Sequence, residues 1–558
     1  MNKRRKKRLL IWGLAIAAVV AAIVIALSVA VNEIEEQSHD KLSEWVASKS
    51  DSLYHTSVAQ VDIGILNSSI NIRQVVVKVD STRLKTLQAA GKLPPTLASL
   101  EIGTIMVSGI SWISLLLRKR IACETLTISD PKVQIQTPTR EETNNYIKDT
   151  AGKGIPSVSI DKISINNPDI TYANEASADQ LTFFLKGGAV NLSDWSYEKN
   201  TRKLGKILYA ESGDFHFDSL VLKRAGSYYS MKTATISFAS SSNGFEIKNL
   251  SFIPAISKEA YYKEIGEQDE IISLNIPLLK VNGLDWDALW QKGKFTARRV
   301  QVQHPKMDVY ISRLPKPAKP KERKLPGEII RSIPNPMMID TIVVSDGSIS
   351  YTELNNLTNM EGTIPFTHVN ATILNVTNIR DSIRKAPICK LTARSQLFGS
   401  IMGMDVQLDL SDSLGAFTMK GYQTSLDGTK LNEITRPLAK LEFKSMQMKK
   451  MEIAVKCDGR AIKGNVLFLY DDLKLRVLDQ KDNGALKKKT LISFIFNKAF
   501  LYPANPMDGE EVRRANFTLE RNINKSFFNL LWTSLRTGAL LTAGRNSDVS
   551  DFIVNKEQ

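Results

Sequence analysis

The sequence predicts a mainly β protein with a membrane-spanning helix at its N-terminus and an amphipathic helix near its C-terminus. Four separated segments of alternating apolar residues fit one template, which predicts a sheet built from repeated units. A basic cluster followed by a long uncharged run predicts the spanning helix. A run at 526–541 with a single charge predicts the C-terminal helix. The apolar content of 43% is that of a folded chain rather than a disordered one.

The repeat is the strongest signal for the sheet. Cys123–Ile135 aligns without gaps on Ile160–Tyr172, and Ala297–Val309 and Ile339–Tyr351 fit the same frame. Each copy has two apolar residues two apart, a turn-forming dipeptide, and two more apolar residues two apart. The dipeptides are Asp130-Pro131, Asn167-Pro168, His304-Pro305 and Asp346-Gly347. A period of two marks a strand, and Pro or Gly marks a tight reversal, so each copy predicts a hairpin-like unit of an antiparallel sheet.

The alternation places the apolar residues of the copies on one face of this sheet. The residues predicted to share that face are Leu126, Ile128, Ile163, Ile165, Val300, Val302, Ile342 and Val344. Polar residues such as Thr125, Lys162 and Gln301 point to the other face, with Val343 as the exception. An apolar face must be covered. A second sheet would close it into a sandwich, whereas acyl chains could cover an open face, and both alternatives remain.

The N-terminus predicts a membrane anchor in residues 1–32. Six basic residues, Lys3 to Arg8, precede an uncharged run from Leu9 through Trp12 to Val31. At about 1.5 Å per residue this run is long enough for a bilayer core of roughly 30 Å. The basic flank favours a cytoplasmic N-terminus and a translocated remainder. A cleaved signal peptide, with Ser28-Val29-Ala30 before the cleavage site, is the alternative.

The rest of the chain divides into further segments. A helix and first β unit are predicted for 33–150, two sheet halves for 151–315 and 327–489, and a Pro- and Lys-rich linker for 316–326. Asp471-Asp472 predicts the turn of a further hairpin. In the helical region 490–558, Phe527, Phe528, Leu531 and Trp532 are candidates for membrane contact. This helix could instead cap the sheet.

Composition argues against catalysis and against nucleic acid. Neither a phosphate-binding loop, a nucleophile elbow nor a metal-ligand spacing occurs, so no catalytic residue, metal or cofactor is predicted and the protein is not expected to be an enzyme. The three cysteines are unpatterned and predict buried thiols. The net charge of +16, of which the six basic residues of the N-terminal flank are part, suits anionic lipid headgroups, and a basic surface that only keeps the chain soluble is the alternative. The predicted export of the chain argues against nucleic acid as a partner.

These features together resemble the AsmA-like family of bacterial envelope proteins, which is related to the repeating β-groove lipid transporters. The residues that carry the resemblance are Lys3 to Val31, Ile110 to Ile135, the repeat copies, Leu469 to Leu473 and Ser526 to Leu541. It implies an inner-membrane anchor, a bulk in the periplasm of a Gram-negative bacterium, and an elongated, curved, groove-like sheet with an apolar concave face.

The function implied by the resemblance is to bind or shuttle phospholipids along the groove and so to support outer-membrane lipid homeostasis or assembly. The implied partners are phospholipid and the inner membrane, with the outer membrane or an envelope protein as further partners. The rival hypothesis is a non-catalytic envelope scaffold with a closed β-sandwich core. An enzyme acting at the membrane surface is a third, for which the sequence offers no polar cluster.

Overall fold

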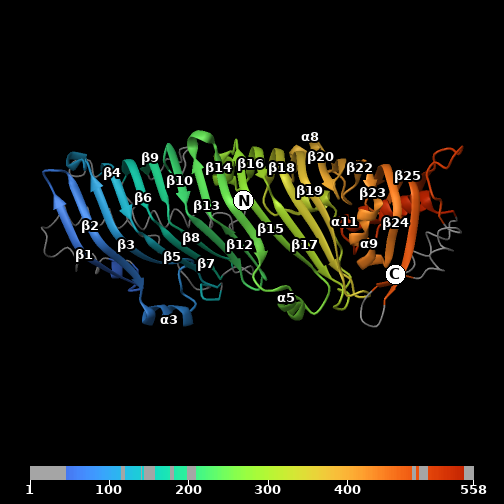
Figure 1. Cartoon of the computed structure of the whole chain (residues 1–558). Helices are drawn as coiled ribbons and strands as arrows, with labels where there is room; N and C mark the ends of the chain where they lie inside the picture. Colours follow the sequence, from blue (N-terminus) through green and yellow to red (C-terminus); the bar gives the residue numbers. More distant parts are fainter. Residues whose placement is uncertain are drawn as a thin grey trace. The chain divides into compact units, whose positions relative to one another are not determined.

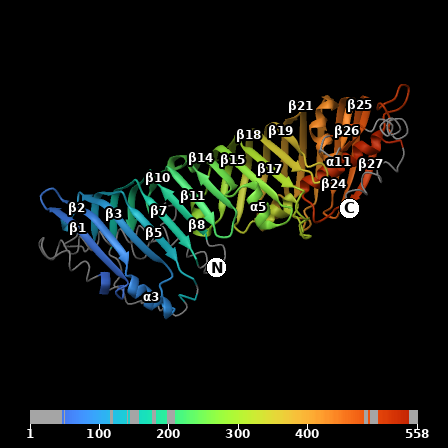
Figure 2. The same ribbon diagram turned by 60° about the horizontal axis from the view of Figure 1, so that its bottom comes forward.

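Strands dominate the structure, which confirms the mainly β class. The computed structural model describes residues 46–48, 50–114, 120–139, 141–143, 157–175, 181–197, 209–480, 486–488 and 501–545. The chain forms two compact units, Met1–Phe252 with Asn282–Gly293, and Ile253–Val281 with Lys294–Gln558. Figures 1 and 2 show the strands of each unit side by side.

The predicted membrane anchor cannot be located in the structure. No helix within the described ranges is both long and apolar enough to cross a bilayer. The predicted span, with Leu9, Trp12 and Val31, lies outside the described residues.

The described residues of the first unit form fourteen strand segments and short helices, one of which lies at one end of the sheet (Figure 1). The strands are β1 (Tyr54–Gly64), β2 (Ser69–Val79), β3 (Leu97–Ser108), β4 (Ile121–Ser129), β5 (Lys132–Thr137), β6 (Val158–Asn166), β7 (Asp169–Asn174), β8 (Leu181–Lys186), β9 (Ala189–Tyr197), β10 (Ser212–Phe217), β11 (Ser219–Arg224), β12 (Tyr229–Thr233), β13 (Thr235–Ala239) and β14 (Gly244–Pro254), whose last two residues belong to the second unit. The helices are α3 (Ser81–Ala89) and α6 (Trp286–Lys292). Asp80 caps α3 by accepting a hydrogen bond from the backbone N–H of Arg83.

The second unit is another run of strands with helices against its later part. Its strands are β15 (Glu270–Asn282), β16 (Phe295–Gln303), β17 (Lys306–Ser312), β18 (Met337–Leu354), β19 (Glu361–Thr377), β20 (Ile388–Leu397), β21 (Ser400–Asp409), β22 (Phe417–Gln423), β23 (Leu426–Asp427), β24 (Leu441–Cys457), β25 (Ala461–Gln480), β26 (Leu486–Lys488) and β27 (Arg514–Glu520). The helices are α5 (Lys258–Ile265), α7 (Pro326–Ser332), α8 (Arg380–Lys385), α9 (Asn432–Ala439) and α11 (Phe527–Ala543). From β18 to β22 each strand pairs antiparallel with the next.

The prediction of an antiparallel sheet is wrong at the repeat copies, because the sheet is mixed. β4 pairs with β6 in parallel, and Cys123 lies opposite Ile160, the same correspondence as in the gapless alignment. β16 likewise pairs with β18 in parallel, with Ala297 opposite Ile339. The aligned copies are therefore neighbouring strands that run in the same direction. Residues that align in the sequence lie opposite each other in the sheet.

The predicted reversals are also wrong, because the chain kinks at these positions and continues in the same direction. β4 and β5 both pair with β3, one with residues 104–108 and the other with residues 97–101. The residues at the kinks have left-handed backbone conformations, with φ of 55° at Asp130, 51° at Asn167, 50° at His304 and 50° at Asp346. An extra residue of this kind is a β-bulge, which bends a strand without ending it.

The predicted hairpin turn at Asp471-Asp472 is also wrong, because the strand continues through these residues. β25 runs without interruption from Ala461 to Gln480, and Asp472 within it has φ of 49°. Its side chain accepts a hydrogen bond from Lys474, at 2.5 Å. Two adjacent aspartates therefore mark a bulge in a long strand.

Each kink shifts the alternation of side chains by one residue. Leu126 and Ile128 precede Asp130 and are buried, and Val133 and Ile135 follow it and are also buried. A strand with a strict period of two would turn even-numbered and odd-numbered residues to opposite faces. The extra residue keeps both halves of the strand apolar on the same face.

Hydrogen bonds join the kinks of neighbouring strands. The backbone N–H of Asp130 donates to the carbonyl of Asn166, at 3.0 Å, and the Asn167 amide side chain donates to the Asp130 carboxylate, at 2.6 Å. In the second unit the N–H of His304 donates to the carbonyl of Ser345, at 2.8 Å. The kinks thus lie side by side, and the backbone groups that they free are satisfied.

The Pro- and Lys-rich segment 316–326 is part of a connection inside the second unit. β17 and β18 pair in parallel, so the chain must return along the sheet between Ser312 and Met337. The start of the segment is held by Gln268, whose backbone N–H donates to the carbonyl of Lys316, at 2.9 Å. Its end is the first residue of α7, Pro326, a position that suits proline.

The kinks lead to a prediction at Gln74, an exposed residue of β2 with φ of 52°. Gln74→Gly is expected to raise the free energy of unfolding by up to about 1 kcal/mol, since glycine adopts this conformation without strain. Gln74→Val is expected to lower it by about 1–2 kcal/mol, because a β-branched residue is strained there. Urea denaturation of the full chain measures both. Arg73→Val, at an exposed strand position without positive φ, is the control, and equal effects of valine at 73 and 74 would contradict the assignment.

Candidate functional site

The apolar face predicted from the repeat copies extends across many strands of the second unit. Val302 lies opposite Val344 in β18, and Val344 lies opposite Ala371 in β19. The register continues the row through Ala393, Met404, Gly421, Ile453, Val466 and Ala515. A parallel row contains Val300, Ile342, Ile373, Leu391, Val406, Met419 and Val455. Nine strands therefore contribute aliphatic side chains or glycine to one continuous face.

The adjacent row, on the opposite face, is mostly polar. It contains Gln301, Val343, Thr372, Thr392, Asp405 and Lys420. Thr392 donates a hydrogen bond to the carboxylate of Asp405, at 2.7 Å. Val343 is the apolar exception in this row. Because side chains alternate along the strand, the neighbouring valines Val343 and Val344 point to opposite faces.

Beyond the kink, a second group of apolar residues continues the same face. Because of the shift at the bulge, these residues are odd-numbered in β17 and β18 and even-numbered in β15 and β19. They are Leu274, Met307, Ile349 and Phe366 in one row and Ile272, Val309, Tyr351 and Ile364 in the next. The sequence-based assignment missed several of them because it ended each strand at the supposed turn. The sequence feature that could have identified them is the alternation of apolar and polar residues after His304-Pro305 and Asp346-Gly347.

Burial divides this face into two parts. In β15 to β20 the apolar side chains of these rows remain partly exposed, apart from Val300, which is 8% exposed. We call these residues the partly exposed apolar face: Ile272, Leu274, Val302, Met307, Val309, Ile342, Val344, Ile349, Tyr351, Ile364, Phe366, Ile373 and Leu391. In β21 to β25 most residues of the same rows are buried, with exposed fractions of 3% at Val406, 4% at Met419 and 0% at Val466, while Met404 and Gly421 are half-buried.

Helix α11 covers the buried part of the face. It lies against β25 and β27 (Figure 2). A Cβ atom added to Gly538 would lie 2.3 Å from Cγ2 of Val466, so glycine allows the helix to touch the strand. Ser534 and Thr542 donate their hydroxyl hydrogen bonds within the helix, to the carbonyls of Leu530 and Gly538. The predicted helix at 526–541 is thus confirmed, and its inner side caps the sheet.

The outer side of α11 faces solvent. Leu531 is buried, and the ring of Phe527 packs edge-on against Phe417, with 5.3 Å between ring centroids. Phe528 and Trp532, one helical turn apart, are 63% and 48% exposed. The four candidates for membrane contact therefore divide into two that anchor the helix and two that remain accessible.

The copies in the first unit lie in a closed core. Leu126, Ile128 and Ile163 are 1–3% exposed and belong to a cluster with Ile70, Val107 and Leu192, and Ile165 packs against it partly buried. The hollow at the kinks of this unit, about 380 Å³, is lined by polar and charged residues such as Asp130, Lys132 and Asp169. Of the eight predicted face residues, most of those in the first unit are therefore buried, and most of those in the second unit are partly exposed.

The three cysteines are buried, as predicted. Burial raises the pKa of the Cys123 thiol to about 12 and that of Cys389 to about 11. Burial also raises the pKa of Cys457. Thiols in this state are poor nucleophiles.

A group of histidines surrounds one kink. His368 Nδ1 lies 2.8 Å from the carboxylate of Asp346, and His304 Nδ1 lies 3.3 Å from it. The hydrogen bond from His368 is the main cause that lowers the pKa of Asp346. All three side chains are about half exposed or more. Within the described part of the chain, no three His, Cys, Asp or Glu side chains are placed to hold a metal ion.

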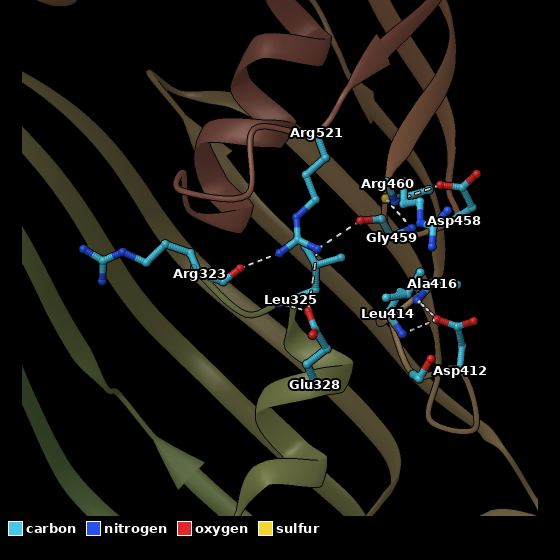
Figure 3. Close-up of polar contacts among 12 residues, drawn as sticks. Arg323, Leu325, Glu328, Asp412, Leu414, Ala416, Asp458, Gly459, Arg460 and Arg521 are labelled. Atoms are coloured by element: carbon cyan, nitrogen blue, oxygen red, sulfur yellow. Dashed lines mark hydrogen bonds and ion pairs between the residues drawn. The ribbon is translucent and has the colours of Figure 1, made fainter. Parts of the chain in front are cut away.

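Arg521 joins three distant segments of the second unit (Figure 3). Its guanidinium donates to the carbonyls of Arg323 and Gly459, the latter at 3.1 Å, and lies 3.7 Å from the carboxylate of Glu328. The arginine side chain is 5% exposed. The connection before α7, the β24–β25 turn and the segment before α11 are therefore held at one buried charge.

No protein-family model matches the sequence, and no curated protein matches it. The resemblance to the AsmA-like family therefore stays a prediction.

Removal of this arginine should destabilise the second unit. Arg521→Ala would leave Glu328 and two carbonyls without their partner in a buried site, at a cost of about 3–5 kcal/mol. Urea denaturation measures the loss. Arg384→Ala is the matched control, since Arg384 is 80% exposed and pairs with the exposed Asp381. A loss at Arg521 no larger than that at Arg384 would contradict the proposed role.

Glu442 gives the second unit an acid-sensitive contact. Burial raises its pKa, but hydrogen bonds from Arg436 and Arg476, both at 2.5 Å, outweigh this, and the net shift is downward. The contact therefore stabilises the fold above the ordinary glutamate pKa of 4.5 and is lost as the pH falls through the lower, folded value. Glu442→Gln is expected to be less stable than wild type at neutral pH, and the gap should narrow in acid. Urea midpoints measured across this pH range test it, and a constant gap would contradict it.

Proposed function

We propose that this chain is a membrane-anchored protein that binds phospholipid acyl chains on the partly exposed apolar face of its second unit. The observation that supports the proposal is that alternating apolar side chains from six neighbouring strands keep to one face and yet, apart from Val300, stay partly accessible. Monomeric soluble proteins rarely expose large contiguous apolar patches, and larger ones mark binding sites.

Acyl chains are the occupant that best suits this surface. The face is apolar, and the register of the strands continues the Val302 and Val300 rows from each strand to the next without a charged residue in either. Burial of a methylene group is worth about 0.8 kcal/mol, so a two-chain lipid moved through water would lose tens of kcal/mol. On a continuous apolar face the acyl chains exchange one apolar contact for another, so movement along the face changes the free energy little. No catalytic residue is required.

The location follows from the N-terminal sequence and the family resemblance. We propose that residues 1–32 hold the chain in the inner membrane and that the bulk lies in the periplasm of a Gram-negative bacterium. The sheet would then be elongated, curved and groove-like, and would serve outer-membrane lipid homeostasis or assembly. The basic cluster Lys3 to Arg8 and the uncharged run to Val31 support this orientation.

The rival function, an envelope scaffold with a closed core, is favoured by one observation in the first unit. Leu126, Ile128 and Ile163 are packed as tightly as residues of an ordinary protein core. Lipid binding is therefore assigned to the second unit.

The neighbouring valines of β18 provide a matched test. The photo-reactive residue benzoyl-phenylalanine is placed at Val344 or at Val343, in the full chain expressed in a Gram-negative host. Val344 lies beside Val302 and Ala371, whereas Val343 lies beside Gln301 and Thr372. After irradiation, mass spectrometry of the chain is expected to find phospholipid attached at 344 and not at 343.

Two further variants separate binding from folding. Val344→Asp places a charge on the apolar face and should abolish the lipid that co-purifies with the chain, while Val343→Asp should retain it. Equal cross-linking at the two positions, or a well-folded chain without lipid, would overturn the proposal and favour the scaffold.

A further inference from the structure

The exposed side of α11 continues an apolar patch that begins in the preceding loop. Ile523 is 49% exposed, Phe528 is 63% exposed and Trp532 is 48% exposed. Ser526 caps the helix between them by accepting a hydrogen bond from the backbone N–H of Asn529, at 3.3 Å. The patch is therefore carried by a capped helix whose other side is fixed to the sheet.

Exposed lysines without ion-pair partners occur in the segment 316–324, whose end is bonded to the loop before α11, and at Lys525 in that loop. Among the described residues, the ammonium groups of Lys316, Lys319, Lys321, Lys324 and Lys525 form no ion pair. Two acidic residues lie near the segment: Glu267 accepts from the backbone N–H of Lys319, and Asp269 lies 3.8 Å from Arg323. Glu322 is the acidic residue inside the segment, so basic groups remain in excess.

Direct contacts hold the basic segment against the loop before α11. The backbone N–H of Arg323 donates to the carbonyl of Ile523, at 2.8 Å, and the carbonyl of Arg323 accepts from the buried guanidinium of Arg521 (Figure 3). These contacts hold Arg323, and with it the neighbouring Lys324, beside Ile523. We call the combination the basic–aromatic patch: Lys316, Lys319, Lys321, Lys324, Ile523, Lys525, Phe528 and Trp532.

We propose that the basic–aromatic patch docks on the surface of an anionic lipid bilayer. Trp and Phe are suited to the headgroup region, where one side of a helix is apolar and its surroundings are wet. Unpaired lysines near an anionic bilayer contribute about 1 kcal/mol each, which is about fivefold in affinity per lysine. A protein partner would need matching carboxylates at each lysine, whereas lipid phosphates supply a continuous anionic surface. This contact is separate from the N-terminal anchor and from acyl-chain binding at Val344.

A fluorescent probe at position 532 tests the proposal. Trp532→Cys in the full chain is labelled with the environment-sensitive dye NBD, and the three native cysteines are buried and so spared. The chain is reconstituted into vesicles of phosphatidylcholine, with or without phosphatidylglycerol. With phosphatidylglycerol the emission is expected to shift to the blue and to be quenched by spin-labelled lipid, and with phosphatidylcholine alone it is expected not to. The same dye at Leu357→Cys, where the native side chain is 69% exposed, is the control and should not respond.

Substitution of the lysines identifies the source of the response. Lys316→Gln, Lys319→Gln, Lys321→Gln and Lys324→Gln are expected to weaken the response about fivefold per residue, and the four Lys→Arg variants to retain it. A silent probe at 532, an equal response in neutral vesicles, or a response unchanged by the glutamines would overturn the proposal. A blue shift that requires an added envelope protein would overturn it too and would make the patch a protein-docking site. Cross-linking at Val344 is measured separately, so each proposal can fail alone.

Discussion

The apolar face depends on one extra residue at the kink of several strands. A strand turns alternate side chains to opposite faces, so an apolar face can continue past a bend only if the alternation shifts by one. At Asp130, Asn167, His304 and Asp346 a residue in the left-handed conformation provides this shift. Hydrogen bonds between kinks on neighbouring strands then align the bends, as between Asp130 and Asn167. The apolar rows on both sides of the kinks, and hence the candidate site, exist because of this shift.

The parallel pairing of the repeat copies has a second effect on the site. Parallel neighbours cannot be joined by a tight turn, so a long connection has to run between β17 and β18. That connection carries the exposed lysines and ends in α7, and Arg521 holds it to the segment before α11. The mixed sheet thus determines where the basic groups of the second unit lie.

Much of the fold could be predicted from the sequence, and the part that could not has a clear physical reason. The gapless alignment of Cys123–Ile135 on Ile160–Tyr172 matches the observed register. The direction of the chain was wrong, because Asp-Pro and Asn-Pro are favourable both in a hairpin turn and in a bulge. Only pairing with a third strand, as of β3 with both β4 and β5, decides between the two.

The candidate site could also be predicted only in part from the sequence. Alternation placed Val302 and Val344 on the apolar face, with Val343 opposite, as the register has it. Which part of the face is covered could not be predicted, because the cover comes from tertiary contacts such as Gly538 on Val466. The packing of Leu126 and Ile163 into a closed core, in contrast to Val302 and Val344, depends on the same kind of contact.

The connection between β17 and β18 also bears on how the molecule would survive proteolysis. Its lysines are exposed, so a trypsin-like protease could cut near Lys319. β16 and β17 would then belong to one fragment and β18 to the other, yet two parallel hydrogen-bond ladders would still join them. A nicked chain would therefore remain a single particle under native conditions and separate into two fragments only after denaturation. The second unit could accordingly be assembled from two separately made polypeptides.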